Sequence, residues 1–234
     1  MAKGKGGGAR WRLRLIALLV LVLAFAGIAG WWQMRQWAPS RKAFPMQGAE
    51  IGLEDGPVDW TALKTIGADF VYLDASASAF SRDQAFVRNL EDARAARLEV
   101  GAVHLYDPCQ PADRQAANFV TVVPRDGKLL PPAVELDRLA DDCPVHVSDA
   151  AVESELMTFL NQVETHAGKP VILKLTRRFE RRYHVANTIG RNLWLVRDRF
   201  EPDYADRPWT LWTANGGLMT DADDEPLHWV VVRP

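Results

Sequence analysis

Several side chains that can transfer a proton stand at the ends of hydrophobic runs. Glu135 and Asp137 are two residues apart, and on a β-strand this spacing places both carboxylates on one face. Glu50 ends an earlier run. Carbohydrate cleavage uses such groups, because one carboxyl donates a proton while another stabilises the developing positive charge. Glu50, Glu135 and Asp137 are therefore candidate catalytic residues, although the spacing also suits solvent-exposed or ion-paired acids.

Aromatic and imidazole side chains near the same positions are candidates for substrate binding. Tyr72 and His104 lie near the ends of two apolar runs, and Trp212 lies in a third with Trp209 just before it. Flat rings of this kind stack on sugar faces. His104 is equally compatible with a hydrogen-bonded core histidine, and Tyr72 can point inward or outward.

The elements that would position these residues alternate between short apolar runs and helical segments. Helical spacing of apolar residues predicts helices over 83–97, 114–122 and 148–166. The last of these would be capped by Ser148 or Asp149 and would end near Gly168. Strands are expected at 70–73, 100–105, 133–137, 171–175, 193–196, 210–212 and 228–232. This order predicts an α/β fold, a modified TIM-like (β/α) barrel of about eight strands. Its ligand site would lie at the C-terminal ends of the strands.

Local motifs then resemble one enzyme family, the family 25 glycoside hydrolases or Chalaropsis-type lysozymes. The opening motifs are Gly56-Pro57-Val58-Asp59-Trp60, Asp69-Phe70-Val71-Tyr72-Leu73 and the set Asp83, Phe86 and Asn89. The later motifs are Gln115-Ala116-Ala117-Asn118-Phe119, Pro131-Pro132-Ala133-Val134-Glu135-Leu136-Asp137 and Trp209-Thr210-Leu211-Trp212. The resemblance runs from about Gly48 to the C-terminus. It implies an N-acetylmuramidase that cleaves the β-1,4 bond between N-acetylmuramic acid and N-acetylglucosamine in peptidoglycan.

The chain departs from the family pattern at the positions that the resemblance makes catalytic. The family's first-strand D-x-S is Glu50-Ile51-Gly52 here, its Q-G is Asp55-Gly56, and its D-x-E is Glu135-Leu136-Asp137, the two acids in reverse order. A carboxyl group displaced by about 1 Å can cost on the order of a hundredfold in rate.

Further positions of the family pattern have lost their usual side chain, among them a glutamine and a tyrosine replaced by Thr213 and Ala214. An acid becomes Ala77, a tyrosine becomes Lys174 and a late aspartate becomes His228. Lys174 can pair with Glu135 or Asp137 from a neighbouring strand, which would keep a carboxylate ionised and weaken it as an acid.

Two hypotheses follow. In the first, the chain is a peptidoglycan hydrolase with weak activity, in which Glu135 or Asp137 is the general acid and Glu50 supports the reaction. In the second, it is a catalytically impaired pseudoenzyme that binds peptidoglycan or an envelope protein. We expect no cofactor, no metal site and no nucleic-acid partner, and we expect a monomer.

Cys109 and Cys143 are the two cysteines of the chain. In an exported domain an even count predicts a disulfide, and two free buried thiols are the alternative.

The N-terminus predicts a membrane segment. Basic residues within 1–14, among them Lys3 and Lys5, precede an uninterrupted apolar run over 15–32, which is just long enough to cross a bilayer. The basic flank favours the cytoplasmic side, so the domain would face the periplasm or cell exterior. The alternative is a cleaved signal peptide and a secreted domain, since Ala24-Phe25-Ala26 has the form of a cleavage site.

Length and composition agree with one globular domain behind this segment. The chain has 234 residues, 48% hydrophobic and 25% charged, with a net charge of −2 that does not indicate nucleic-acid binding. We expect a basic tail over 1–14, an anchor over 15–32, a linker over 33–46 and a barrel domain over 47–234.

Overall fold

The computed structural model describes residues 7–52 and 56–234, which form two compact units divided between Trp37 and Ala38. The predictions on Lys3, Lys5 and Asp55 lie outside the described residues. The first unit consists of helix α1 (Gly7–Arg35). Its segment Trp11–Arg35 has no acidic side chain and is long and apolar enough to cross a membrane, by length and composition alone. The helix therefore contains the predicted span 15–32.

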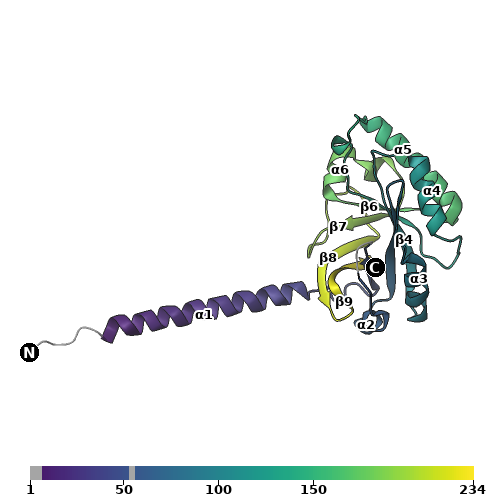
Figure 1. Ribbon diagram of the computed structural model, residues 1–234. Coiled ribbons are helices and arrows are strands. Elements are labelled where there is room, and N and C mark those ends of the chain that lie inside the picture. Colours follow the sequence, from purple (N-terminus) through teal and green to yellow (C-terminus); the bar gives the residue numbers. More distant parts are fainter. Residues whose placement is uncertain (1–6, 53–55) are drawn as a thin grey trace, which may run out of the picture. The chain divides into compact units, whose positions relative to one another are not determined.

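The second unit is a barrel of eight strands, as the element order predicts (Figure 1). Its strands are β1 (Gln47–Ile51), β2 (Phe70–Ala77), β4 (Glu99–Leu105), β5 (Ala133–Leu136), β6 (Ile172–Leu175), β7 (Leu193–Val196), β8 (Leu211–Thr220) and β9 (Asp223–Val232). They are hydrogen-bonded in the order β1-β9-β8-β7-β6-β5-β4-β2, and pairing of β1 with β2 closes the ring. The short strand β3 (Ser81–Arg82) adds to the edge of β2.

The sheet is mixed rather than wholly parallel. Seven strands of the barrel run parallel to one another, namely β1, β2, β4, β5, β6, β7 and β8. Strand β9 is antiparallel to both of its neighbours, β8 and β1. The last two strands are a long hairpin of ten residues each, much longer than the apolar cores of 210–212 and 228–232 that sequence patterning detects. The end of the hairpin is polar and contains glycine, so it lacks that patterning. It is still part of the sheet because the backbones of β8 and β9 pair as far as Thr220 and Asp223.

Helices lie outside the strands, and Figure 1 shows α3, α4 and α5 along one side of the barrel. The helices of this unit are α2 (Trp60–Thr65), α3 (Phe86–Ala95), α4 (Ala112–Val122), α5 (Asp149–Ala167), α6 (Arg177–Tyr183), α7 (Val185–Thr188) and the 3₁₀ turn η1 (Ala140–Asp142). The predicted ends of α5 are confirmed. Ser148 accepts a hydrogen bond from the Ala151 amide, and Gly168 closes the helix at φ 66°, a conformation that glycine adopts without steric cost.

The predicted linker 33–46 is partly folded. Residues from Ala38 onward belong to the barrel unit. The side-chain amide of Gln47 donates to the carbonyl oxygens of Pro39 and Phe44, and Arg41 forms an ion pair with Asp69. These contacts place the segment from Pro39 to Phe44 on the barrel and shorten the connection to α1.

Inward-facing side chains fill the barrel, as they do in packed barrels of this size. The core cluster consists of Phe70, Tyr72, Val103, Ala133, Ile172, Trp194, Leu211 and Val230. Tyr72 can point inward because its neighbour in the sheet is Gly101, where a Cβ atom would lie 2.2 Å from the tyrosine ring. The apolar layer closes the barrel interior and leaves the charged inward-facing residues to the strand ends.

Candidate active site

A lysine is at the centre of the candidate site. Lys174 on β6 donates from Nζ to Glu50 on β1, at 2.5 Å, and to Glu135 on β5, at 2.6 Å. Strand pairing explains part of this arrangement, because Glu135 and Lys174 are opposite each other in the register of β5 and β6. Glu50 reaches the same ammonium from across the barrel. The structure thus brings two of the three candidate catalytic acids onto one cation.

These charges are largely removed from water. The side chains of Lys174 and Glu50 are 4% and 2% exposed, whereas that of Glu135 is 24% exposed. Burial by itself would raise the pKa of Glu50, but the Lys174 ammonium and the hydrogen bond from His228 outweigh it and hold that pKa well below the usual range. Burial likewise opposes the charged form of Lys174, yet Glu50, Glu135 and Asp74 together raise its pKa. Glu50 is therefore held as a buried anion by Lys174 and His228, and its catalytic role stays a prediction.

His228 lies at the edge of the same cluster. It pairs with Glu50 in the register of β1 and β9, and its Nδ1 atom is 3.3 Å from the Glu50 carboxylate. This hydrogen bond raises the pKa of His228, whose side chain is half exposed. The histidine therefore shields one side of Glu50 from solvent and adds positive charge to it when protonated.

Asp137 points to an open pocket next to this cluster. The residue follows β5 directly and is exposed. A pocket of about 260 Å³ is lined by Ala77, Ser78, Leu105, Tyr106, Asp107, Glu135, Asp137 and Arg138. All of these residues stand at or just beyond the C-terminal ends of β2, β4 and β5, where barrels of this kind bind ligands. Glu135 and Asp137 are the two candidate catalytic acids that a ligand in this pocket can touch.

Tyr72 is not at this pocket. It is 2% exposed in the core, and its hydroxyl donates to the carbonyl oxygen of Pro131, which precedes β5. Pro131 is at the N-terminal side of β5, whereas Glu135 and Asp137 are at its C-terminal end. Burial also raises the pKa of the Tyr72 hydroxyl. The Tyr72 ring packs against Trp194 in the core, and its predicted role in substrate binding stays a prediction.

His104 and Trp212 are also buried. His104 is fully buried on the outward face of β4, where it stacks on Phe159 and bonds to Ser76 and Gln115. Because the Gln115 Oε1 atom can only accept, Nε2 of His104 carries the proton and Nδ1 accepts from Ser76. Burial lowers the pKa of His104 from 6.5 to about 4.

Trp212 is 3% exposed and packs against Phe44 and Trp209. Its indole N–H donates to the carbonyl oxygen of Arg197. Trp212 and His104 are both buried and do not line the pocket beside Asp137, and their predicted role in substrate binding stays a prediction. An apolar alternating pattern predicts that a residue is in a strand, but it does not say which face is open.

The predicted disulfide is confirmed. Cys109 and Cys143 are bonded, with their Cα atoms 5.3 Å apart. The bond joins the loop between β4 and α4 to the segment that follows η1, so it links two of the loops that border the pocket.

Two pocket residues escaped the sequence reasoning. Asp107 and Arg138 form an ion pair at 2.8 Å, and both line the pocket. Asp107 follows β4 by two residues and Arg138 follows Asp137, so a search of every strand end for charged residues would have found them.

Comparison with known proteins agrees with this geometry. The family model described as "Glycosyl hydrolases family 25" matches residues 51–215. No curated protein sequence matches the chain at a comparable level. A family 25 glycosyl hydrolase from Bacillus anthracis superposes with a TM-score of 0.75 at 24% identity, covering 86% of this chain and 93% of that one.

Two further solved structures share the fold. A bacterial lysozyme from Streptomyces coelicolor has a TM-score of 0.71 at 17% identity, over 81% of this chain and 92% of that one. A family GH25 lysozyme from Aspergillus fumigatus has a TM-score of 0.68 at 18% identity, over 81% and 94%. With the family match covering most of the chain, this protein belongs to glycosyl hydrolase family 25.

Proposed function

We propose that the protein is a lysozyme-like N-acetylmuramidase with weak activity, which cleaves the β-1,4 bond between N-acetylmuramic acid and N-acetylglucosamine in peptidoglycan. The observation that carries the proposal is the pocket of about 260 Å³ at the strand ends, lined by Glu135 and Asp137 in a family 25 barrel. The superposing structures include lysozymes and a muramidase, which supports the same substrate class.

In this proposal Asp137 donates the proton to the leaving oxygen. It is the more exposed of the two pocket acids and can approach a glycosidic bond from the open side. Glu135 is oriented by Lys174 and contributes its negative charge to the oxocarbenium-like transition state or to the acetamido group of the substrate. Glu50 acts on the reaction indirectly, because it holds the Lys174 ammonium that in turn orients Glu135.

The same lysine explains why the activity would be weak. Its ammonium is 2.6 Å from Glu135, the acid that must stabilise positive charge on the sugar. A cation at that distance cancels much of the field that the carboxylate would supply to a second cation.

A second candidate function is binding of glycan strands without cleavage. The observation that favours it is the contact of Lys174 with both Glu50 and Glu135, which engages two of the three candidate acids in ion pairs. Such a pseudoenzyme would keep the pocket and lose the reaction.

We further propose that α1 anchors the domain on the outer face of the cytoplasmic membrane, where peptidoglycan lies. The apolar length of α1 and the basic residues that precede and begin it support this orientation. A domain released by cleavage after Ala26 is the alternative.

Digestion and binding of peptidoglycan, measured in the same experiment, distinguish these functions. Residues 38–234, a compact unit, are incubated with purified peptidoglycan, and reducing ends and co-sedimented protein are both measured. A muramidase releases reducing ends above the blank. Binding without release supports the second candidate, and neither binding nor release contradicts both.

A further inference from the structure

We infer that Arg138 binds a carboxylate on the ligand and so makes the pocket selective for glycans that carry muramic acid or its peptide. The inference rests on the proposed function, because it concerns the ligand of the same pocket. It is drawn from the way Arg138 is held, from its charge relative to its neighbours and from its exposure.

Arg138 is fixed at one end and open at the other. Its Nη1 atom donates to Asp107 at 2.8 Å, and the Asp107 side chain is only 8% exposed. The Arg138 side chain is 45% exposed and lines the pocket beside Asp137. A guanidinium has five N–H donors, so an ion pair through one nitrogen leaves donors for a second carboxylate.

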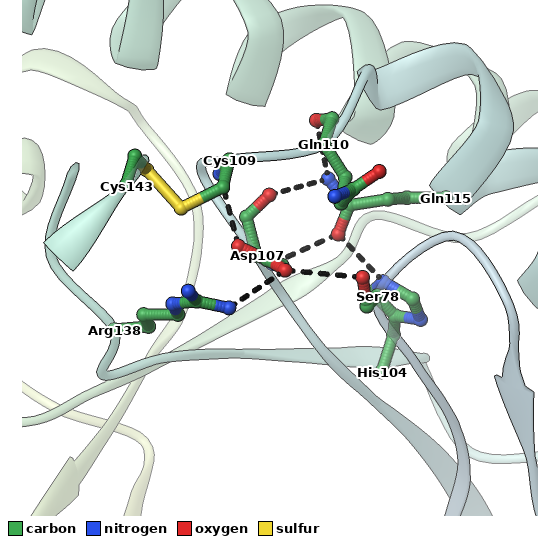
Figure 2. Close-up of polar contacts among 8 residues, drawn as sticks. All are labelled: Ser78, His104, Asp107, Cys109, Gln110, Gln115, Arg138 and Cys143. Atoms are coloured by element: carbon green, nitrogen blue, oxygen red, sulfur yellow. Dashed lines mark hydrogen bonds and ion pairs between the residues drawn. A yellow bond between two sulfur atoms is a disulfide. The ribbon is translucent and has the colours of Figure 1, made fainter. Parts of the chain in front are cut away.

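Asp107 is itself held by several hydrogen bonds (Figure 2). Its Oδ2 atom accepts from Ser78 at 3.1 Å as well as from Arg138, and its Oδ1 atom accepts from the Cys109 amide at 2.9 Å. The buried Gln115 amide bonds to both the backbone N–H and the carbonyl of Asp107, each at 2.8 Å. This network fixes the carboxylate, and the carboxylate in turn orients the guanidinium before any ligand arrives.

The disulfide ties both partners of the ion pair together. Cys109 is two residues after Asp107, and Cys143 is five residues after Arg138. Figure 2 shows the sulfur bridge beside the ion pair. The two loops that carry Asp107 and Arg138 therefore cannot separate without breaking a covalent bond.

The charge of the pocket makes Arg138 important for an anionic ligand. Among the lining residues that the structure describes, Arg138 is the one cation, while Asp107, Glu135 and Asp137 are acidic. These acids repel a ligand carboxylate, so binding of one depends on the guanidinium. N-acetylglucosamine carries no carboxylate. Muramic acid without a peptide carries one on its lactyl group, and where a peptide is attached there the carboxylates are those of the peptide.

Calorimetric titration of the full chain in detergent micelles tests the inference with three probes. These are a tetramer of N-acetylglucosamine, peptide-free glycan strands with free lactyl carboxylates, and strands that keep their peptides. We expect Arg138→Gln to weaken binding of at least one carboxylate-bearing probe by about tenfold and to leave the tetramer unchanged. Loss on peptide-free strands identifies the lactyl group, and loss restricted to the third probe identifies the peptide.

Two further variants are controls for Arg138→Gln. Arg178→Gln is the matched control, since Arg178 is 48% exposed and pairs with Asp142 at 2.8 Å on α6, outside the residues that line the pocket. It should change no affinity. Arg138→Lys keeps the positive charge but lacks the planar guanidinium with its several N–H donors. It should recover part of the affinity that Arg138→Gln loses. Equal weakening on all three probes, or none, overturns the inference while the proposed function stands. Failure of the unmodified chain to bind any probe overturns both.

Discussion

The Nζ atom of Lys174 lies 2.5 Å from Oε1 of Glu50, although the two residues are 124 positions apart in the chain. Closure of the barrel between β9, β1 and β2 brings them together, and the side chains are almost fully buried. With Glu135 on the other side of the ammonium, two acids neutralise the lysine. Glu135 and Asp137 both line the pocket, and Asp137 is the more exposed of the two.

Removal of the lysine tests how much this cluster supports the fold. Lys174→Met should lower the free energy of unfolding by about 3–5 kcal/mol, because it leaves the buried Glu50 carboxylate without its cation. Urea denaturation of residues 38–234 at pH 7 measures the loss. The double variant Glu50→Gln/Lys174→Met removes both charges and should recover part of it. An equal loss in the two variants would show that the ion pair is not the cause.

Sequence patterning predicted the architecture well because burial imposes regular spacing. The strands at 70–73, 100–105 and 193–196 and both ends of α5 have local signals, apolar runs in the strands and capping residues in the helix. The resemblance to family 25 also predicted the barrel fold, and the match to the family model confirms the family.

The side chains of the site were predicted less well. Tyr72 and Trp212 are buried, which the sequence did not predict, because alternation along a strand does not distinguish a closed core from an open groove. The pairing of Lys174 with Glu135 was expected from adjacent strands. Its contact with Glu50 was not, since it depends on barrel closure across 124 residues.

The buried histidine makes an acid-sensitive contribution to stability. The pKa of His104 falls from 6.5 to about 4 on burial, so the fold favours the neutral ring. This contribution is fully present above pH 6.5 and is lost as the pH falls toward 4, because the unfolded chain then binds a proton that the folded chain does not. We expect a loss on the order of 2–3 kcal/mol between pH 6.5 and 4.5.

Comparison of two variants separates the contribution of His104 to the pH dependence of stability from that of other titrating groups. His104→Gln should flatten the pH dependence of unfolding over that window, whereas His146→Gln, at an exposed position, should leave it as in the unmodified protein. Identical pH dependence in all three proteins would rule out His104 as the source.

The disulfide should stabilise the barrel unit. Cys109 and Cys143 close a loop with a sequence separation of 34, which corresponds to roughly 3–4 kcal/mol in the chain-entropy view. The double variant Cys109→Ser/Cys143→Ser should unfold at lower urea by that amount. Reducing agent should destabilise the unmodified protein similarly and leave the double variant unchanged, and a response of the variant to reductant would point to another cause.

The N-terminal helix should remain on the mature protein. Trp11–Arg35 at about 1.5 Å per residue spans roughly 37 Å, more than a hydrocarbon core of about 30 Å. Full-length chain should stay in the membrane pellet after alkaline carbonate extraction, while residues 38–234 should not. Mass spectrometry of the pelleted protein should find peptides from the segment 11–35. A mature protein that begins after Ala26 would contradict the anchor.

The most direct test of the proposed muramidase is the product formed from peptidoglycan and its dependence on Asp137. Mass spectrometry of soluble products should detect fragments that end in reducing N-acetylmuramic acid. Asp137→Asn should reduce their rate of release by on the order of a hundredfold or more, since it removes the proton donor. Asp113→Asn, an exposed aspartate on α4, is the control and should not change the rate. Release that persists unchanged in Asp137→Asn, or its absence from the unmodified protein, would contradict the proposal.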